Sequence, residues 1–116
     1  MPLPTVTATQ MVQLDYTRPV SFHVQVGNAM PGGTTWHCLS QAGECRGEEV
    51  SLDDVANLQF STLFLTTTVE DDNPATNNTA VTYHIRNGDR VQSFPFSFTL
   101  PDKVRFVVYL IDFTFI

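Results

Sequence analysis

The feature that most constrains this chain is a strict alternation of apolar and polar residues over several short segments. Residues 20–26 read VSFHVQV and residues 81–86 read VTYHIR, and each segment places its apolar side chains at one parity. Residues 94–100 (FPFSFTL) place three phenylalanines and a leucine at one parity in the same way. Because successive side chains of a β-strand point to opposite faces, this period of two predicts strands with one buried face.

Four other segments have strand character of a less regular kind. Residues 6–14 keep most of their apolar side chains at one parity, and residues 34–39 resume as a short strand. Residues 58–69 are rich in β-branched and aromatic residues, but the run Leu63-Phe64-Leu65 predicts a strand covered on both faces or one that changes face at a bulge. Residues 104–116 are apolar at both parities through their middle, which predicts a strand at the centre of the core.

Turn signals separate these segments. Residues 27–33 (GNAMPGG) predict a loop, and Asn87-Gly88-Asp89 predicts a hairpin turn because Asn and Gly tolerate positive φ. Pro95 cannot donate a hydrogen bond to a β-ladder, so its strand is expected to lie at a sheet edge or to be bulged. Residues 51–57, which begin like a capping box, are the one place where a short helical turn is expected.

Together these signals predict an all-β fold. We expect an antiparallel β-sandwich of six to seven strands, with at most one short helical turn near residues 51–57. A small closed β-barrel is the alternative. The length of 116 residues fits one domain, so residues 1–116 are expected to form a single sandwich domain.

Charge and motif content exclude several classes of function. Twelve acidic against six basic residues give a formal net charge of -6, which disfavours nucleic acids and anionic membranes as partners.

No apolar stretch approaches the roughly 20 residues that span a bilayer, so a soluble protein without a transmembrane segment is expected. The opening Met1 to Pro4 lacks the pattern of a signal peptide, and an extracellular and a cytoplasmic location both remain open. Because the chain has neither a nucleophile elbow nor a Walker phosphate loop, no enzymatic activity is expected.

Two groups of residues are candidates for disulfide or metal chemistry. Cys38 and Cys45 are close enough in sequence to form a disulfide if the protein is exported, whereas in the cytosol they would remain reduced thiols. Glu70, Asp71 and Asp72 offer the oxygen ligands that calcium prefers. Their spacing matches no EF-hand loop, so a solubilising acidic loop is the favoured interpretation and no cofactor is expected.

The three histidines are a second candidate set for a metal ion. Imidazole is a common ligand of transition metals, and the chain contains His23, His37 and His84. Two of them lie on the polar parity of different strands, so histidines exposed on strands are the favoured interpretation.

The best candidate for a ligand site surrounds the single tryptophan. Trp36 follows a glycine-rich loop, and an indole at a loop edge offers the flat apolar face and the single donor that sugar rings use. His37, Asn28 and Thr35 would add polar contacts, which makes a shallow glycan site plausible. The competing interpretation, which we favour on sequence grounds, places Trp36 in the core of the sandwich.

These observations favour a non-enzymatic recognition module that presents loops 27–35 and 70–79 to a glycan, in the manner of a lectin, or to a protein ligand. The alternative is a self-associating structural protein, such as a coat, tail or inclusion component, or an obligate homo-oligomer. The reason is an apolar surplus in the last two strands, of which Phe94, Phe96 and Phe98 are part. On that hypothesis aromatic residues of these strands form the subunit interface.

Overall fold

The computed structural model describes residues 3–116, so the first two residues of the amino-terminal segment considered above lie outside it. The described chain forms nine strands and one short 3-10 helix. In chain order these are β1 (Thr5–Val12), β2 (Val20–Val26), β3 (Gly32–Cys38), β4 (Gln41–Cys45), β5 (Val50–Leu52), η1 (Val55–Asn57), β6 (Thr62–Glu70), β7 (Asn78–Asn87), β8 (Arg90–Thr99) and β9 (Phe106–Phe115).

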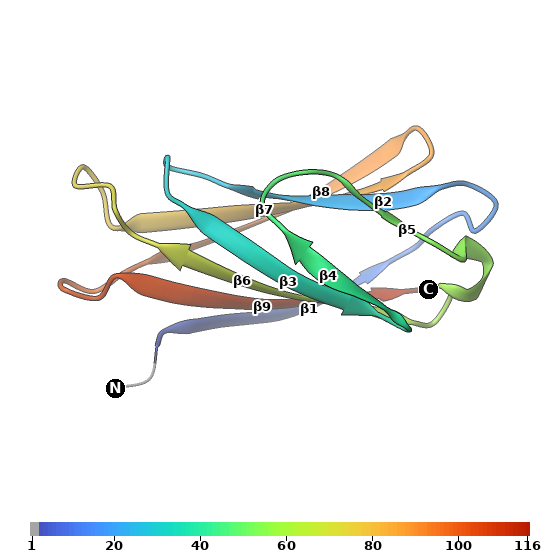
Figure 1. Cartoon of the computed structure of the whole chain (residues 1–116), viewed down its shortest axis with the longest axis horizontal. Helices are drawn as coiled ribbons and strands as arrows, with labels where there is room; N and C mark the ends of the chain where they lie inside the picture. The colour runs from blue at the N-terminus through green and yellow to red at the C-terminus, as the bar shows by residue number, and fades with distance from the viewer. Residues whose placement is uncertain (1–2) are drawn as a thin grey trace.

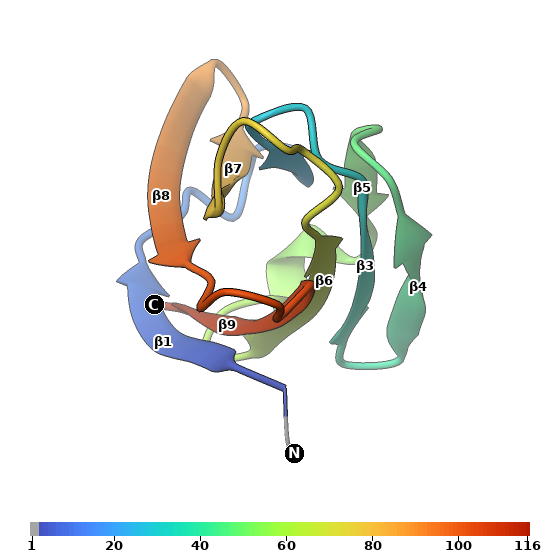
Figure 2. The same cartoon turned by 90° about the vertical axis from the view of Figure 1, so that its left-hand side faces the viewer.

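The strands form two sheets that pack face to face. One sheet has the order β1-β9-β6-β3-β4 and the other the order β5-β2-β7-β8. All pairings are antiparallel except that of β1 with β9, which is parallel. Figure 2, which looks along the strands, shows the sheets as two layers around a common core (Figures 1 and 2). The predicted β-sandwich is therefore confirmed, and the closed barrel is not formed.

The core is built from the inward parity of both sheets. Its largest fully buried side chains are Phe22, Tyr83, Tyr109, Phe113 and Phe115. The buried hydroxyl groups are paired: Tyr83 donates a hydrogen bond to Thr67 Oγ1 (2.8 Å), and the Tyr109 hydroxyl lies 2.6 Å from Thr79 Oγ1. Among residues 3–116, no buried side-chain nitrogen or oxygen lacks a partner.

The phenylalanines of β8 are half-buried and pack against this core. Phe94 packs against Phe113 with ring centroids 4.9 Å apart, and Phe96 packs edge-on against Tyr83 at 5.8 Å. The core-facing position of these side chains leaves less of their surface for a partner, and a subunit interface on the last two strands stays a prediction. The edge position predicted from Pro95 is confirmed, since β8 pairs only with β7.

The two strands with apolar residues at both parities leave one face open. β6 alternates without a bulge along its ladder with β9, so Leu63 and Leu65 point inward and Phe64 points outward. β9 lies between β1 and β6, as its expected central position requires, yet Phe106 and Leu110 on its outer face are 39% and 40% exposed. The expected coverage of both faces is wrong, because the sandwich has only two layers.

Residues 39–57 contain two strands that the sequence did not predict. A tight turn at Leu39, whose φ is 55°, returns the chain into β4, and β5 follows as an edge strand of the other sheet. These two short strands raise the count to nine from the expected six to seven. The expected helical turn exists at residues 55–57, but Asp54 caps it in a left-handed conformation without a side-chain hydrogen bond.

No helix in the described residues has the length and apolar character needed to span a bilayer.

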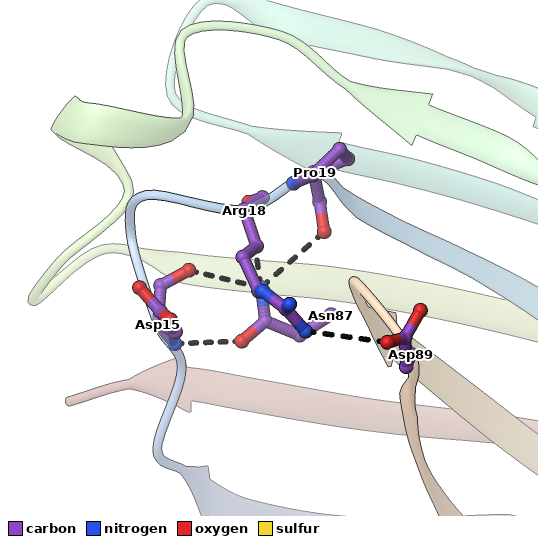
Figure 3. Close-up of polar contacts among 5 residues, drawn as sticks. All are labelled: Asp15, Arg18, Pro19, Asn87 and Asp89. Carbon is purple, nitrogen blue, oxygen red and sulfur yellow. Dashed lines mark hydrogen bonds and ion pairs between the residues drawn. The ribbon is translucent and has the colours of Figure 1, made fainter.

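The predicted hairpin joins β7 to β8 and is anchored by a buried asparagine. Asn87 is 6% exposed, and its Oδ1 accepts a hydrogen bond from the Asp15 N–H (2.6 Å). Its Nδ2 lies within 3.0–3.4 Å of the carbonyl oxygens of Asp15, Arg18 and Pro19 (Figure 3). Gly88 occupies the turn with φ 62°, and Arg18 pairs with Asp89 across it at 3.6 Å. Asn87 thus ends the strand and holds the preceding connection in place.

Candidate binding surface

Strand β3 divides the residues predicted around the tryptophan between two faces. Trp36 points inward and packs edge-on against Phe22 of the opposite sheet, with ring centroids 5.4 Å apart. A Cβ atom at Gly43 of β4 would lie 3.0 Å from the indole Nε1, so the glycine allows β4 to cover the ring. Thr35 and His37 have the opposite parity and are exposed. The favoured core interpretation of Trp36 agrees with this placement.

Asn28 lies at the end of the sandwich, in the loop that precedes β3. Its Nδ2 donates a hydrogen bond to the Asn78 carbonyl oxygen (2.6 Å), and its own carbonyl oxygen accepts one from Asn73 Nδ2 (2.9 Å). Its φ of 58° is a left-handed conformation that asparagine tolerates better than most residues. Asn28 therefore joins two loops, and the structure does not bring it together with Thr35 and His37 in one hollow.

His37 has an aromatic neighbour that the sequence reasoning missed. It lies directly opposite Phe64 of β6, and the two rings stack with centroids 4.6 Å apart and planes 17° apart. Phe64 is 40% exposed, so the pair presents an aromatic surface on the outer side of the sheet. The signal that could have revealed it is parity: Phe64 shares its parity with Thr66 and Thr68, which marks the outward face of that strand.

Threonine hydroxyl groups adjoin the stacked pair on the same side of the sheet. Thr35 lies opposite Thr66, and Thr68 follows on β6. We call the outward surface formed by Thr35, His37, Phe64, Thr66 and Thr68 the threonine face. All five side chains stand on two hydrogen-bonded strands in the interior of the five-stranded sheet, so their backbone positions are rigidly held.

The threonine face is hollowed and carries charge at its rim. A shallow hollow of about 370 Å³ is lined by all three threonines of the face and flanked by Glu44, Arg46, Glu70 and Phe106. A second hollow next to it is lined by the stacked pair and by Trp36, and it shares Thr35, Thr66 and Glu44 with the first, so the two are continuous. Thr35, Trp36 and His37 of the predicted ligand site therefore line one hollow, although the indole packs inward. The surface therefore combines hydroxyl groups, carboxylates and one guanidinium with an aromatic pair.

Two of the three acidic residues considered as calcium ligands, Glu70 and Asp71, contact neighbouring loop groups. Glu70 ends β6 and pairs with Arg105 at 3.3 Å. The Asp71 N–H donates to the Arg105 carbonyl oxygen (2.7 Å), and Asp71 Oδ1 accepts a hydrogen bond from the Asn73 N–H. Across residues 3–116, no three carboxylate, imidazole or thiol groups gather as a metal ion would require. Trp36 and Asp72 do not share a site in either hollow of the threonine face.

The two cysteines do not form the disulfide considered above. Cys38 lies opposite Gln41 and Cys45 lies opposite Thr34, so they are four positions apart along the hairpin. At about 3.3 Å per residue this is roughly 13 Å, well beyond the span of a disulfide. Both are buried free thiols, and burial raises the pKa of each, which disfavours the reactive thiolate.

Comparisons of this chain with protein-family models, with curated proteins and with solved structures found no match. The function of this chain is therefore inferred from its own surface chemistry.

Proposed function

We propose that this protein is a non-enzymatic recognition module that binds a glycan on the threonine face. The observation that carries the proposal is the stacked His37–Phe64 pair, which lies beside three threonine hydroxyl groups on rigid strands. The proposal keeps the lectin-like function inferred from the sequence. It moves the binding surface from the loops to the outer side of the five-stranded sheet.

The chemistry of a sugar ring matches this surface in two ways. A pyranose has an apolar face of C–H groups that packs on aromatic rings, and Phe64 supplies such a ring at the surface. Its hydroxyl groups both donate and accept hydrogen bonds, as do the side chains of Thr35 and Thr66. Glu44 and Glu70 at the rim would accept further bonds, and Arg46 would donate them.

The shallow shape of the surface favours an extended ligand over a small compact one. Small-molecule sites bury most of their ligand in a deep cleft, whereas the two hollows of the threonine face are open and continuous. An oligosaccharide could lie across β3 and β6 with one ring on Phe64 and its neighbour over Thr66. Because the strands are already ordered, binding would cost little conformational entropy in the protein.

The test is a glycan array followed by calorimetric titration of the best ligand. We expect Phe64→Ala to weaken binding about tenfold or more, because about 1.4 kcal/mol of lost stacking and burial corresponds to a factor of ten. Phe60→Ala is the matched control, since Phe60 is also a surface aromatic residue, 77% exposed, and lies outside the threonine face. The absence of any glycan ligand, or equal binding by the Phe64→Ala variant, would contradict the proposal.

Self-association is the second candidate function, and one observation favours it. Phe106 and Leu110 project from the outer side of β9, beside the threonine face, and are 39% and 40% exposed. A second copy could cover these apolar side chains. Light scattering tests this: if the protein is a dimer through β9, Leu110→Asp should give monomers. Val91→Asp, which changes a 43% exposed side chain on the other sheet, should leave the mass unchanged.

A further inference from the structure

The outer side of the four-stranded sheet brings two histidines together. His23 of β2 and His84 of β7 are direct partners in the antiparallel register. Their imidazole rings stack with centroids 4.3 Å apart and planes 15° apart, and both side chains remain partly accessible. Each histidine has the polar parity of its strand, but only the register shows that the two are adjacent.

The surroundings of His84 fix its ring. Its Nε2 lies 3.1 Å from Gln25 Oε1, and its Nδ1 lies 2.8 Å from Ser93 Oγ. Because the Gln25 carbonyl oxygen can only accept, this arrangement assigns the proton of the neutral ring to Nε2 and the lone pair to Nδ1. A histidine that ligates a metal commonly donates its other N–H to an oxygen in this way. Gln25 therefore supplies an outer-shell contact that orients the ring.

His23 differs from its partner because, within residues 3–116, no hydrogen bond or ion pair engages its ring nitrogens. One imidazole is thus held by its neighbours, and the other is available to turn toward it. In a site with two imidazole ligands, each nitrogen lies about 2.0–2.1 Å from the ion, so the nitrogens are at most about 4 Å apart. The stacked arrangement, with ring centroids 4.3 Å apart and planes 15° apart, is not itself the binding geometry, because the two lone pairs lie in nearly parallel planes. For one ion to contact both rings, His23 would turn toward His84, and His84 Nδ1 would give up its contact with Ser93 Oγ.

We propose that His23 and His84 form a surface site for a divalent transition-metal ion of the zinc class, with water completing the coordination. Imidazole suits Zn²⁺, Ni²⁺ and Cu²⁺, whereas Ca²⁺ and Mg²⁺ prefer oxygen ligands. The site is distinct from the threonine face, because β2 and β7 belong to the other sheet.

The charges around the pair are compatible with a bound cation. Arg86 is the next outward residue on β7, and it pairs with Glu49, which also accepts a hydrogen bond from Ser21. Burial and the neighbouring His23 lower the pKa of His84, which favours its neutral ring, and a bound ion would take the place of Ser93 Oγ at Nδ1. The net charge of -6 attracts cations at long range.

The experiment is a calorimetric titration of the full chain, without an affinity tag, with Zn²⁺ at pH 7.5. The variants are His23→Gln and His84→Gln, and His37→Gln is the matched control because the third histidine lies on the opposite sheet. We expect one ion per chain, unchanged affinity in the control, and a loss of about tenfold or more in each of the other two, since even outer-shell changes cost about 10–100-fold. Equal affinity in all four proteins, or no saturable binding to the unmodified chain, would overturn the proposal.

A second measurement avoids the dependence on variants that fail to fold. Substoichiometric Cu²⁺ added to the unmodified protein should broaden the imidazole proton signals of His23 and His84 before those of His37. Uniform broadening of all three histidines would indicate independent, nonspecific sites and would also overturn the proposal. At pH 5 the selective broadening should be lost, because protons compete for the imidazole lone pairs.

Discussion

The two ends of the sandwich are both held by asparagine side chains, but in different environments. At one end, Asn87 is 6% exposed and binds backbone groups of the connection between β1 and β2. At the other end, Asn28 and Asn73 join the loop before β3 to the loop before β7, and their hydrogen bonds are exposed to solvent. Figure 1 shows these loops at opposite ends of the long axis.

The difference teaches that one side-chain chemistry can serve two purposes. A buried amide makes hydrogen bonds to backbone groups that water cannot reach, so its loss leaves those backbone groups unsatisfied. An exposed amide competes with water for the same contacts, so its loss changes mainly the order of the loops. We therefore expect the first end to contribute to global stability and the second to local rigidity.

The largest expected effect is that of Asn87→Ala. The substitution removes the acceptor for the Asp15 N–H and the donor to three carbonyl oxygens, in a place where water has little access. We expect the free energy of unfolding to fall by about 2–3 kcal/mol, because each buried unsatisfied group costs about 1–3 kcal/mol. Denaturant unfolding measures this change.

Asn87→Asp is the matched variant for that measurement. It keeps the shape of the side chain and the acceptor for the Asp15 N–H, but it removes the donor and directs a carboxylate at carbonyl oxygens. A loss similar to that of the alanine variant would show that the donor side of the amide carries the effect. If neither variant loses more than about 0.5 kcal/mol, the contrast between the two ends is wrong.

Asn73→Ala is expected to have a smaller effect at the other end. It removes the contact to the Asn28 carbonyl oxygen and the acceptor of the Ala75 N–H, both exposed and 2.9 Å long. The free energy of unfolding should fall by less than about 1 kcal/mol, within the net range of a single hydrogen bond. Amide hydrogen exchange should become faster at Ala75 while the core strands stay protected. A loss as large as that at Asn87 would remove the distinction between the ends.

The strands were predictable from the sequence because, in each alternating segment, the apolar parity identifies the buried face and the polar parity the exposed face. Residues 20–26 coincide with β2, residues 81–86 form the central part of the longer β7 (Asn78–Asn87), and the Asn-Gly signal located the hairpin. The short strands β4 and β5 have no comparable alternation, and tertiary pairing alone defines them. Local pattern therefore identified the long strands and missed the strands that depend on their neighbours.

The candidate surfaces were less predictable because they depend on register. His37 and Phe64 are 27 positions apart in the chain, and His23 and His84 are 61 apart, yet each pair is directly opposite in a ladder. Neither adjacency follows from a period of two, which assigns faces but not partners. Trp36 and Asn28 were grouped with Thr35 by proximity in sequence. Trp36 and Thr35 line one hollow although the indole packs inward, whereas Asn28 lies apart from them in a loop.

The smallest expected effect concerns calcium at the acidic loop, where the second end of the sandwich lies. If Ca²⁺ bound to Glu70, Asp71 and Asp72 in the folded state alone, a hundredfold excess over the dissociation constant would add about 2.7 kcal/mol to stability. The structure already uses two of these residues: Glu70 pairs with Arg105, and Asp71 Oδ1 accepts the Asn73 N–H. Binding would have to displace those contacts.

We therefore expect Ca²⁺ to act on this loop only as a divalent counter-ion. It should screen the net charge of -6, and Mg²⁺ at the same concentration should shift the melting temperature by the same small amount. Thermal unfolding with each ion measures this, with Asp71→Asn/Asp72→Asn as the matched variant. A shift of several degrees that Ca²⁺ alone produces, and that the double variant abolishes, would contradict the expectation. Such a result would also contradict the comparison between the two ends. The exposed end would then contribute to global stability through a bound ion, as the buried end does through Asn87.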